Sequence, residues 1–263
     1  MSEPAVAIRE QPAPPLARRR RTLWREYAES LLVTILLVLF GTSFVVQAYK
    51  IPSRSMEQTL LVGDHLLVNK FVYGGRGAWY EKFLPYREVR RGDIVVFRFP
   101  YDDHAHYVKR VIGLPGDRLK IVSQQVYING EPLEEPYKVH NPDSYDPYED
   151  NFPPAANLIP LRNVRPEWRQ TIQQYVEQGE LVIPPGKYFV LGDNRDSSLD
   201  SRYWGFVDRE NIMGQPVLIY WSLEIPDEVP DGATWNERLA GWTHLLLTVP
   251  RHTRWQRMFR LVR

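Results

Sequence analysis

The 263-residue sequence contains no cysteine. This excludes a disulfide framework, a zinc or iron–sulfur site with cysteine ligands, and thiol catalysis. The sequence also has little net charge, because 33 lysine and arginine residues face 32 aspartate and glutamate residues and leave a formal charge of +1. Nucleic-acid-binding domains usually carry a large basic excess. We therefore predict no nucleic-acid partner.

Sequence motifs for metals and nucleotides are missing as well. The six histidines are scattered, only His104 and His106 lie close together, and no HExxH pattern occurs. No glycine-rich phosphate-binding motif follows a predicted strand. We therefore expect neither a metal nor a cofactor. The 22 prolines argue against an all-helical fold, because proline interrupts helix interiors.

One long run without any charged residue extends from Ser30 to Ala48. As a helix, its 19 residues would span roughly 28 Å, close to the thickness of the hydrocarbon core of a bilayer. A buried core helix is the alternative, but such a helix usually keeps a polar face. A cleaved signal peptide fits less well, because no small-residue cleavage site follows. We predict a transmembrane helix over residues 30–48.

Basic residues are concentrated before this run. By the positive-inside rule, this asymmetry predicts a cytoplasmic basic tail over residues 1–29 and export of everything that follows the helix. Only two basic residues follow the run closely. The arginines that precede it are Arg18, Arg19, Arg20, Arg21 and Arg25.

The chain after the helix is predicted to be mainly β, with an exported domain over residues 49–225. Short runs of β-branched and aromatic residues end at glycine, proline, asparagine or aspartate, as strands do. Asn129-Gly130 predicts a hairpin turn. Residues 137–185 are expected to form an irregular excursion with a short helix over 166–177. The predicted strands are 65–69, 93–99, 107–112, 119–122, 126–128, 187–191 and 216–221.

Two serines, Ser53 and Ser55, follow the predicted helix in a segment that Pro52 opens. A turn there can expose a hydroxyl group, but serine is a weak nucleophile unless a base lies next to it. A solvated linker beside the membrane is the alternative for this segment.

A candidate base lies in the strand predicted over 107–112. Lys109 and Arg110 are adjacent there, so their side chains point to opposite faces and one should point inward. A desolvated lysine loses its proton more readily and can act as a general base. The alternative is a charge on an edge strand that deters aggregation.

The third candidate segment, residues 192–205, packs acids, hydroxyls and arginines into one loop after a strand. A surface turn with salt bridges is its alternative.

Together the three segments resemble those of bacterial type I signal peptidases. S-R-S-M-E-x-T-L, K-R-V-I-G-L-P-G-D and G-D-N-R-D-S-S-x-D-S-R-Y-W-G-F-V occur in that family's order and follow a membrane anchor, as they do there. The resemblance covers about Tyr49 to Trp221 and is poor over 137–185.

The resemblance implies a mainly β catalytic domain of the signal-peptidase and repressor-autoprotease type, with one N-terminal transmembrane helix. It implies that Ser55 is the nucleophile and that Lys109 is the general base of a Ser–Lys dyad. Ser53 and the backbone N–H of Ser55 would stabilise the oxyanion. The residues implied to line pockets for small side chains, usually alanine, one and three positions before the cut are Tyr49, Ile51, Leu60, Tyr107 and Val108.

Three further residues receive supporting roles from the resemblance. Ser198 would orient the lysine, and Asp200 and Arg202 would form an ion pair. One position departs from the family, which normally has proline where this chain has Gln58. Since proline fixes φ and lacks an N–H, we expect a looser turn after Ser55 but no loss of a catalytic group.

The function implied is that of a membrane-anchored serine endopeptidase that removes signal peptides from exported preproteins. Its location would be the outer face of the bacterial cytoplasmic membrane, and its partners would be preproteins and membrane lipid. Two alternatives stay open. A Ser–Lys autoprotease would need a DNA-binding module in place of the anchor, and an anchored binding protein could keep the scaffold without catalysis.

The C-terminal part, residues 226–263, is predicted to be a basic tail. Residues 250–263 contain five arginines and no acid. On a helix, Trp255, Phe259 and Val262 would share one face, which is typical of a segment that lies at a lipid interface. A frayed, solvated terminus is the alternative.

Overall fold

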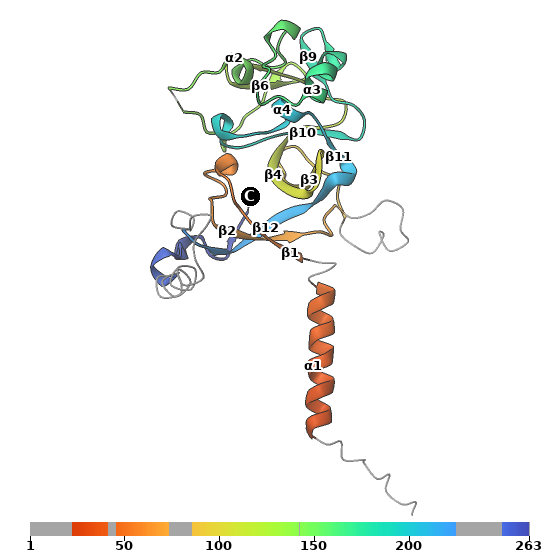
Figure 1. Ribbon diagram of the computed structural model, residues 1–263, viewed down its shortest axis with the longest axis vertical. Helices are drawn as coiled ribbons and strands as arrows, with labels where there is room; N and C mark the ends of the chain where they lie inside the picture. Colours follow the sequence, from red (N-terminus) through yellow and green to blue (C-terminus); the bar gives the residue numbers. More distant parts are fainter. Residues whose placement is uncertain (1–22, 42–45, 74–85, 142, 225–248, 263) are drawn as a thin grey trace, which may run out of the picture. The chain divides into compact units, whose positions relative to one another are not determined.

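The computed structural model describes residues 23–41, 46–73, 86–141, 143–224 and 249–262. The chain divides into two compact units, residues 1–41 and 42–263. The first unit contains helix α1 (Leu23–Phe40), and the second contains all of the strands (Figure 1). Most of the predicted cytoplasmic tail, residues 1–22, lies outside the described residues.

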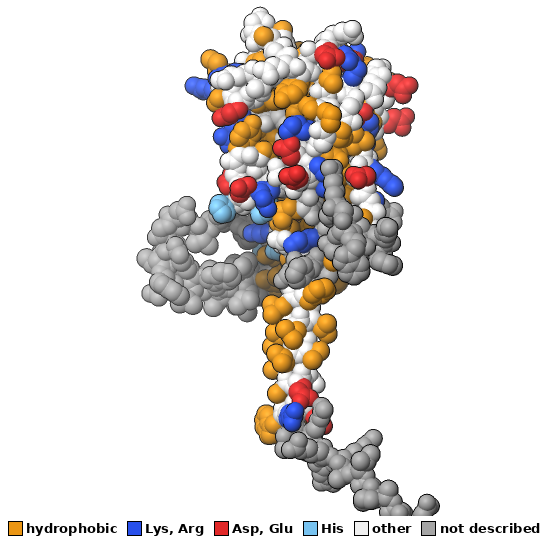
Figure 2. All heavy atoms as spheres, turned by 90° about the vertical axis from the view of Figure 1, so that its right-hand side faces the viewer, with side chains coloured by type: hydrophobic (Ala, Val, Ile, Leu, Met, Phe, Trp, Pro, Cys, Tyr) orange, Lys and Arg blue, Asp and Glu red, His pale blue; other side chains and the backbone are white. Residues whose placement is uncertain are grey.

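Helix α1 differs from the predicted helix at both ends. It begins at Leu23 rather than Ser30, because good helix formers and an ion pair between Arg25 and Glu29 at 2.9 Å extend its first turns. It ends before strand β1 (Val46–Lys50), so the last three residues of the predicted span form hydrogen bonds in a sheet. The apolar side chains of residues 31–40 are exposed in this unit (Figure 2). Within the described residues, no helix is both long and apolar enough to cross a membrane.

The larger of two antiparallel sheets carries the candidate catalytic residues. Its strand order is β1-β2-β12-β3-β4-β10-β11, and β13 pairs with β12 beside this path. Strand β4 therefore lies between two neighbours, β3 and β10. The strands are β2 (Asp64–Asn69), β3 (Ile94–Phe99), β4 (Asp102–Gly113), β10 (Lys187–Leu191), β11 (Val207–Asp208), β12 (Ile212–Ser222) and β13 (Arg260–Leu261).

The smaller sheet has the order β7-β6-β5-β9-β8 and lies at the top of Figure 1. The predicted Asn129-Gly130 turn is confirmed, because both residues have positive φ angles, 54° and 85°, between β6 and β7. The strands are β5 (Arg118–Val122), β6 (Gln125–Ile128), β7 (Glu131–Pro132), β8 (Val176–Glu177) and β9 (Glu180–Val182).

Residues 137–185 are more ordered than the predicted irregular excursion. They contribute β8 and β9 to the smaller sheet and bury Phe152, Trp168 and Ile172 in the main core, and these contacts order the segment. The helix predicted over 166–177 ends at Thr171, and a 3₁₀ turn continues to Tyr175. The short helices of this region are α2 (Pro147–Asp150), η4 (Ala156–Leu158), α3 (Pro166–Thr171) and η5 (Ile172–Tyr175).

The mainly β prediction is confirmed, and each of the predicted strands overlaps an observed one. The C-terminal end differs from its prediction. Residues 225–248 lie outside the described residues. In the arginine-rich end, residues 249–252 are helical, and the chain then forms η8 (Trp255–Arg257) and β13 rather than one continuous helix or a frayed terminus. Its backbone instead pairs with β12. The remaining short helices are η2 (Arg54–Met56), η6 (Arg195–Ser197), α4 (Ser201–Trp204) and η7 (Arg209–Asn211).

Candidate active site

The structure brings Ser55 and Lys109 into direct contact. Ser55 lies in the single turn η2, Lys109 lies in β4, and the lysine Nζ is 2.5 Å from the serine Oγ. Both residues are buried, with 5% and 4% of their surface exposed. A nucleophile within hydrogen-bonding reach of a base is the arrangement that covalent catalysis by serine requires.

The position of β4 explains why both basic residues of the Lys-Arg pair are buried. Lys109 faces Ser55, and Arg110 on the opposite face binds Asp193. Because β4 has a paired strand on each side, the alternative of a charge on an edge strand is wrong for Lys109. The expectation that only one of the two side chains points inward was too narrow, since both are 4% exposed.

Burial strongly perturbs the Lys109 ammonium. Loss of hydration lowers its pKa to about 8, although the negative charges of Asp200 and Asp193 oppose this shift. The positive charge of Arg202 adds to the lowering. A lysine with this pKa is half neutral near pH 8, so it can accept a proton at moderate pH.

Asp200 and Arg202 form a fully buried ion pair next to the lysine. The arginine Nε is 2.9 Å from one carboxylate oxygen, and Nη2 is 3.0 Å from the other. Burial would raise the pKa of Asp200, but the charge and hydrogen bonds of Arg202 and the charge of Lys109 outweigh it and lower this pKa. Asp200 therefore remains ionised and also accepts a hydrogen bond from the backbone N–H of Gly192 at 3.2 Å.

Ser198 is buried beside the Asp200 carboxylate. Among the described residues, its Oγ makes no hydrogen bond of ordinary geometry. The structure thus places Ser198 at the site without the expected contact to the lysine. A Cβ atom added at Gly192 would lie 2.3 Å from this Oγ and 2.5 Å from the backbone oxygen of Ser55. Only glycine fits where the loop and the nucleophile turn approach so closely.

A second buried network, missed by the sequence analysis, joins the same elements. Arg110 binds both carboxylate oxygens of Asp193, at 2.8 and 2.7 Å, and the hydroxyl of Thr59 donates to that carboxylate at 2.6 Å. The Tyr137 ring lies 3.8 Å from the guanidinium. Two adjacent basic residues in one strand were the available signal, but their partners lie far away in the sequence.

The Ser53 side chain is exposed, and its Oγ lies 3.3 Å from the Ser55 Oγ. At this distance the hydroxyl can reach a charge that develops beside the nucleophile. The structure thus places the Ser53 hydroxyl beside the Ser55 hydroxyl, and its role at an oxyanion stays a prediction.

A pocket of about 300 Å³ opens beside the two candidate catalytic residues. Four of the predicted lining residues line it: Tyr49, Ile51, Tyr107 and Val108. Leu60 is not among the residues that line this pocket; its side chain is fully buried in the apolar cluster that contains Met56 and Ile51, and its pocket role stays a prediction. Lining residues that the sequence analysis missed are Lys50, Pro52, Met56, His106, Ser197 and Leu199.

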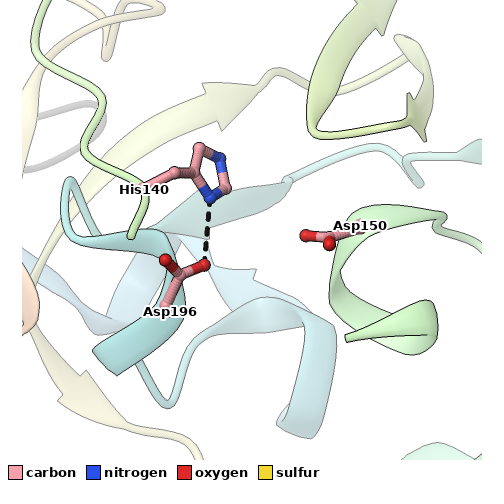
Figure 3. A group of neighbouring side chains, drawn as sticks. All are labelled: His140, Asp150 and Asp196. Carbon is pink, nitrogen blue, oxygen red and sulfur yellow. Dashed lines mark hydrogen bonds and ion pairs between the residues drawn. The ribbon is translucent and has the colours of Figure 1, made fainter. Parts of the chain in front are cut away.

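His140, Asp150 and Asp196 form a further cluster, which no sequence pattern indicated (Figure 3). Their possible ligand atoms lie within 4.8 Å of one another. His140 Nδ1 is 3.0 Å from an Asp196 carboxylate oxygen, and burial lowers the pKa of this histidine. The contact ties the segment around residue 140 to the loop of residues 192–198.

Gln58 adopts a positive φ angle of 82° in the turn that follows the nucleophile. Proline is locked near −65°, so the family's usual residue would not fit this backbone. The structure thus shows a left-handed backbone conformation at position 58, and the looser turn stays a prediction.

The conformation of Gln58 generates a prediction about stability. We expect Gln58→Pro to lower the free energy of unfolding by about 2–3 kcal/mol, because the ring excludes the observed φ. Gln58→Gly should change it by less than about 1 kcal/mol, because glycine adopts positive φ without steric cost. Urea unfolding of both variants measures these changes. Equal stability of the two variants would contradict the described turn.

Similarity to known proteins shows the family of this chain. The family model described as "Signal peptidase, peptidase S26" matches residues 24–221. Signal peptidase I of Pseudomonas fluorescens is 38% identical over 217 residues, which cover 76% of this chain and 74% of the relative. Signal peptidase I of Aquifex aeolicus is 35% identical over 238 residues, 80% of this chain and 89% of the relative.

A crystal structure of a signal peptidase I from Enterococcus faecalis has 32% sequence identity and a TM-score of 0.36, and the match covers 49% of this chain and 97% of that chain. The family match spans well over half of the sequence and includes all three candidate segments. The chain therefore belongs to the signal peptidase family, peptidase S26.

Proposed function

We propose that Ser55 and Lys109 are the catalytic dyad with which this chain removes signal peptides from preproteins. The observation that carries the proposal is the 2.5 Å contact between Nζ and Oγ, made by a lysine whose pKa is lowered to about 8. Membership of the signal peptidase family supports a protease with preprotein substrates.

In the proposed reaction, neutral Lys109 takes the hydroxyl proton of Ser55 while Oγ attacks the scissile carbonyl carbon. The carbonyl electrons move to the oxygen, and the Ser53 hydroxyl and the Ser55 backbone N–H donate to that oxyanion. As the tetrahedral intermediate collapses, the lysine ammonium gives the proton to the departing amine, which leaves an acyl ester on Ser55. Lys109 then takes a proton from a water molecule that attacks the ester, and as the ester C–O bond breaks the lysine ammonium returns a proton to Ser55 Oγ, which restores both groups and releases the acid product.

The pocket beside the dyad supports a preference for small residues before the cut. The pocket has a volume of about 300 Å³, which the two substrate side chains before the cut would have to share. The partly buried rings of Tyr49 and Tyr107 and the buried side chain of Ile51 are among the residues that line it. We propose that substrate alanine side chains, one and three positions before the cut, bind there, and that Ser198 orients Lys109 when substrate is bound.

We also propose that the apolar part of α1 anchors the chain in the bacterial cytoplasmic membrane, with the N-terminus in the cytoplasm. The uncharged run and the exposed apolar side chains of residues 31–40 support this placement. The β-rich unit would then face the outer side. An anchored protease shares the bilayer with the apolar segment of its substrate, which raises their effective concentration.

Removal of either dyad member should abolish cleavage. We expect Ser55→Ala and Lys109→Met to reduce turnover of a preprotein to background, because each removes a group for which the site has no replacement. A gel assay of preprotein processing measures the loss. Retention of more than a few per cent of wild-type turnover by either variant would refute the dyad.

Lys109→Met also supplies its own folding control. The lysine pKa is lower in the folded chain than its ordinary value of 10.5, so burial of the ammonium lowers stability as the pH falls below 10.5, and this loss is complete below about pH 8. Methionine has a similar shape and no charge. The variant should therefore unfold at a higher Tm than wild type at pH 7, while being inactive.

Loss of one oxyanion donor should weaken catalysis without abolishing it. We expect Ser53→Ala to lower kcat by about 10²-fold, because the backbone N–H of Ser55 remains. Steady-state kinetics should show little change in KM. An unchanged kcat would remove Ser53 from the oxyanion site.

The lysine base predicts a specific pH profile. Lys109 must be neutral to accept the serine proton, so kcat/KM should rise tenfold per pH unit and level off above about pH 8. Measurement between pH 6 and about 10 covers this limb. A limb near pH 6.5 would instead indicate a histidine base, whose ordinary pKa is about 6.5.

A further inference from the structure

The C-terminal segment, Thr253–Val262, packs against the chain that directly follows the nucleophile. Its strand β13, blue in Figure 1, pairs with β12 through Leu261 opposite Leu218 and Arg260 opposite Ile219. The backbone N–H of Phe259 donates to Ile219 O at 2.7 Å. The segment is thus held in the larger sheet, although it lies about two hundred residues after Ser55 in the sequence.

Arg257 connects this segment to the nucleophile loop, which we define as residues 56–64. Its Nη2 lies 2.5 Å from one oxygen of Asp64 and 3.0 Å from the backbone oxygen of Thr59, and its Nε lies 3.2 Å from the other Asp64 oxygen. The Asp64 side chain is 0% exposed and that of Arg257 is 12% exposed. A buried, bidentate ion pair of this kind fixes the relative position of its two residues better than an exposed ion pair does.

Asp64 is an anchor for several parts of the site at once. One of its oxygens accepts the backbone N–H of Leu61 at 2.8 Å, and the other accepts the hydroxyl of Ser222 at 2.6 Å. Without the guanidinium, the carboxylate would keep these neutral donors but lose its countercharge. A buried carboxylate without a countercharge is costly, so removal of Arg257 should force the loop around Asp64 to rearrange.

Two further contacts of the C-terminal segment reach the same loop. Arg254 donates to the backbone oxygen of Val62 at 3.0 Å. Val262 packs against the apolar cluster that contains Met56 and Leu60, beneath the nucleophile turn. The outer side of the loop therefore rests on the C-terminal segment over much of its length.

The loop that is held in this way also contains the strained position of the site. Gln58 has a φ of 82°, and such a conformation persists in a non-glycine residue only where its surroundings enforce it. The next residue, Thr59, binds Arg257 through its backbone oxygen and Asp193 through its hydroxyl. Asp193 in turn binds Arg110, the neighbour of Lys109 in β4.

We propose that Arg257 is a positioning residue for the nucleophile: it clamps the loop at Thr59 and Asp64 and thereby keeps Ser55 in line with Lys109. The contacts of Arg257 with Thr59 and Asp64 thus restrict the nucleophile loop, a restriction that a proline at position 58 would otherwise impose through its own backbone. The inference rests on the proposed dyad for its kinetic consequence. Catalysis is sensitive to placement, since a displacement of about 1 Å can cost about 10²-fold in rate.

The test compares three variants of the full chain. Arg257→Leu removes the guanidinium group, and Arg257→Lys keeps the positive charge but cannot form the bidentate contact. Arg251→Leu is the control, because it makes the same charge change at an exposed position of the same region. We expect Arg257→Leu to lower kcat about 10- to 100-fold with KM changed less than about twofold. Arg257→Lys should recover part of the loss, and Arg251→Leu should match wild type.

Hydrogen exchange followed by mass spectrometry gives a second readout that does not depend on activity. In Arg257→Leu, peptides from residues 54–64 should exchange at least about tenfold faster than in wild type, whereas peptides from β4 should keep their protection. Arg251→Leu should show neither change. Faster exchange throughout the β-rich unit would mean general unfolding and would overturn a positioning role.

The two readouts separate the possible failures. Unchanged exchange over residues 54–64 overturns the clamp, whatever the kinetics. Faster exchange with an unchanged kcat shows that the loop is held but that Ser55 does not depend on it, which overturns the positioning role. If wild type itself cleaves no preprotein, the proposed function is wrong. The exchange data still test whether Arg257 restricts the nucleophile loop, because they do not depend on activity.

Discussion

The burial of Lys109 against Ser55 is the constraint on which the rest of the site depends. An ammonium group can be removed from water only if it is paired or gives up its proton. Here the lysine lies between two paired strands, its pKa is lowered to about 8, and its nearest hydrogen-bonding group is a serine hydroxyl. The sheet thus converts a strongly basic side chain into one that can exchange a proton at moderate pH.

The surrounding charges make this possible because they neutralise one another. Arg110 pairs with Asp193, Arg195 with Glu135, and Arg202 with Asp200, and all three arginines are buried. In the part of the chain that the structure describes, Lys109 takes part in no such ion pair. Arginine retains its proton at any physiological pH, whereas lysine can lose it when buried. Asp193 and Asp200 are paired with Arg110 and Arg202, so neither carboxylate forms an ion pair that would hold Lys109 in its charged form.

Much of this arrangement could be predicted from the sequence, and the rest depends on pairing between distant segments. The strands around Lys109 have local signals, and the resemblance singled out Ser55 before any contact was known. The assignment of residues 46–48 to the predicted membrane span failed because an apolar strand and the end of an apolar helix have the same composition. The burial of Leu60 and the partners of Arg110 follow from contacts between residues far apart, which no local pattern encodes.

The pairing of β13 with β12 has a consequence for the order in which the chain matures. The nucleophile loop lies near the start of the β-rich unit, but Arg257, which binds Asp64, follows that loop by about two hundred residues and is synthesised long after it. A ribosome that has made both Ser55 and Lys109 has therefore not yet made everything that contacts their loop. The growing chain therefore holds an unfinished site until the segment that contains Arg257 has been made and has paired with β12.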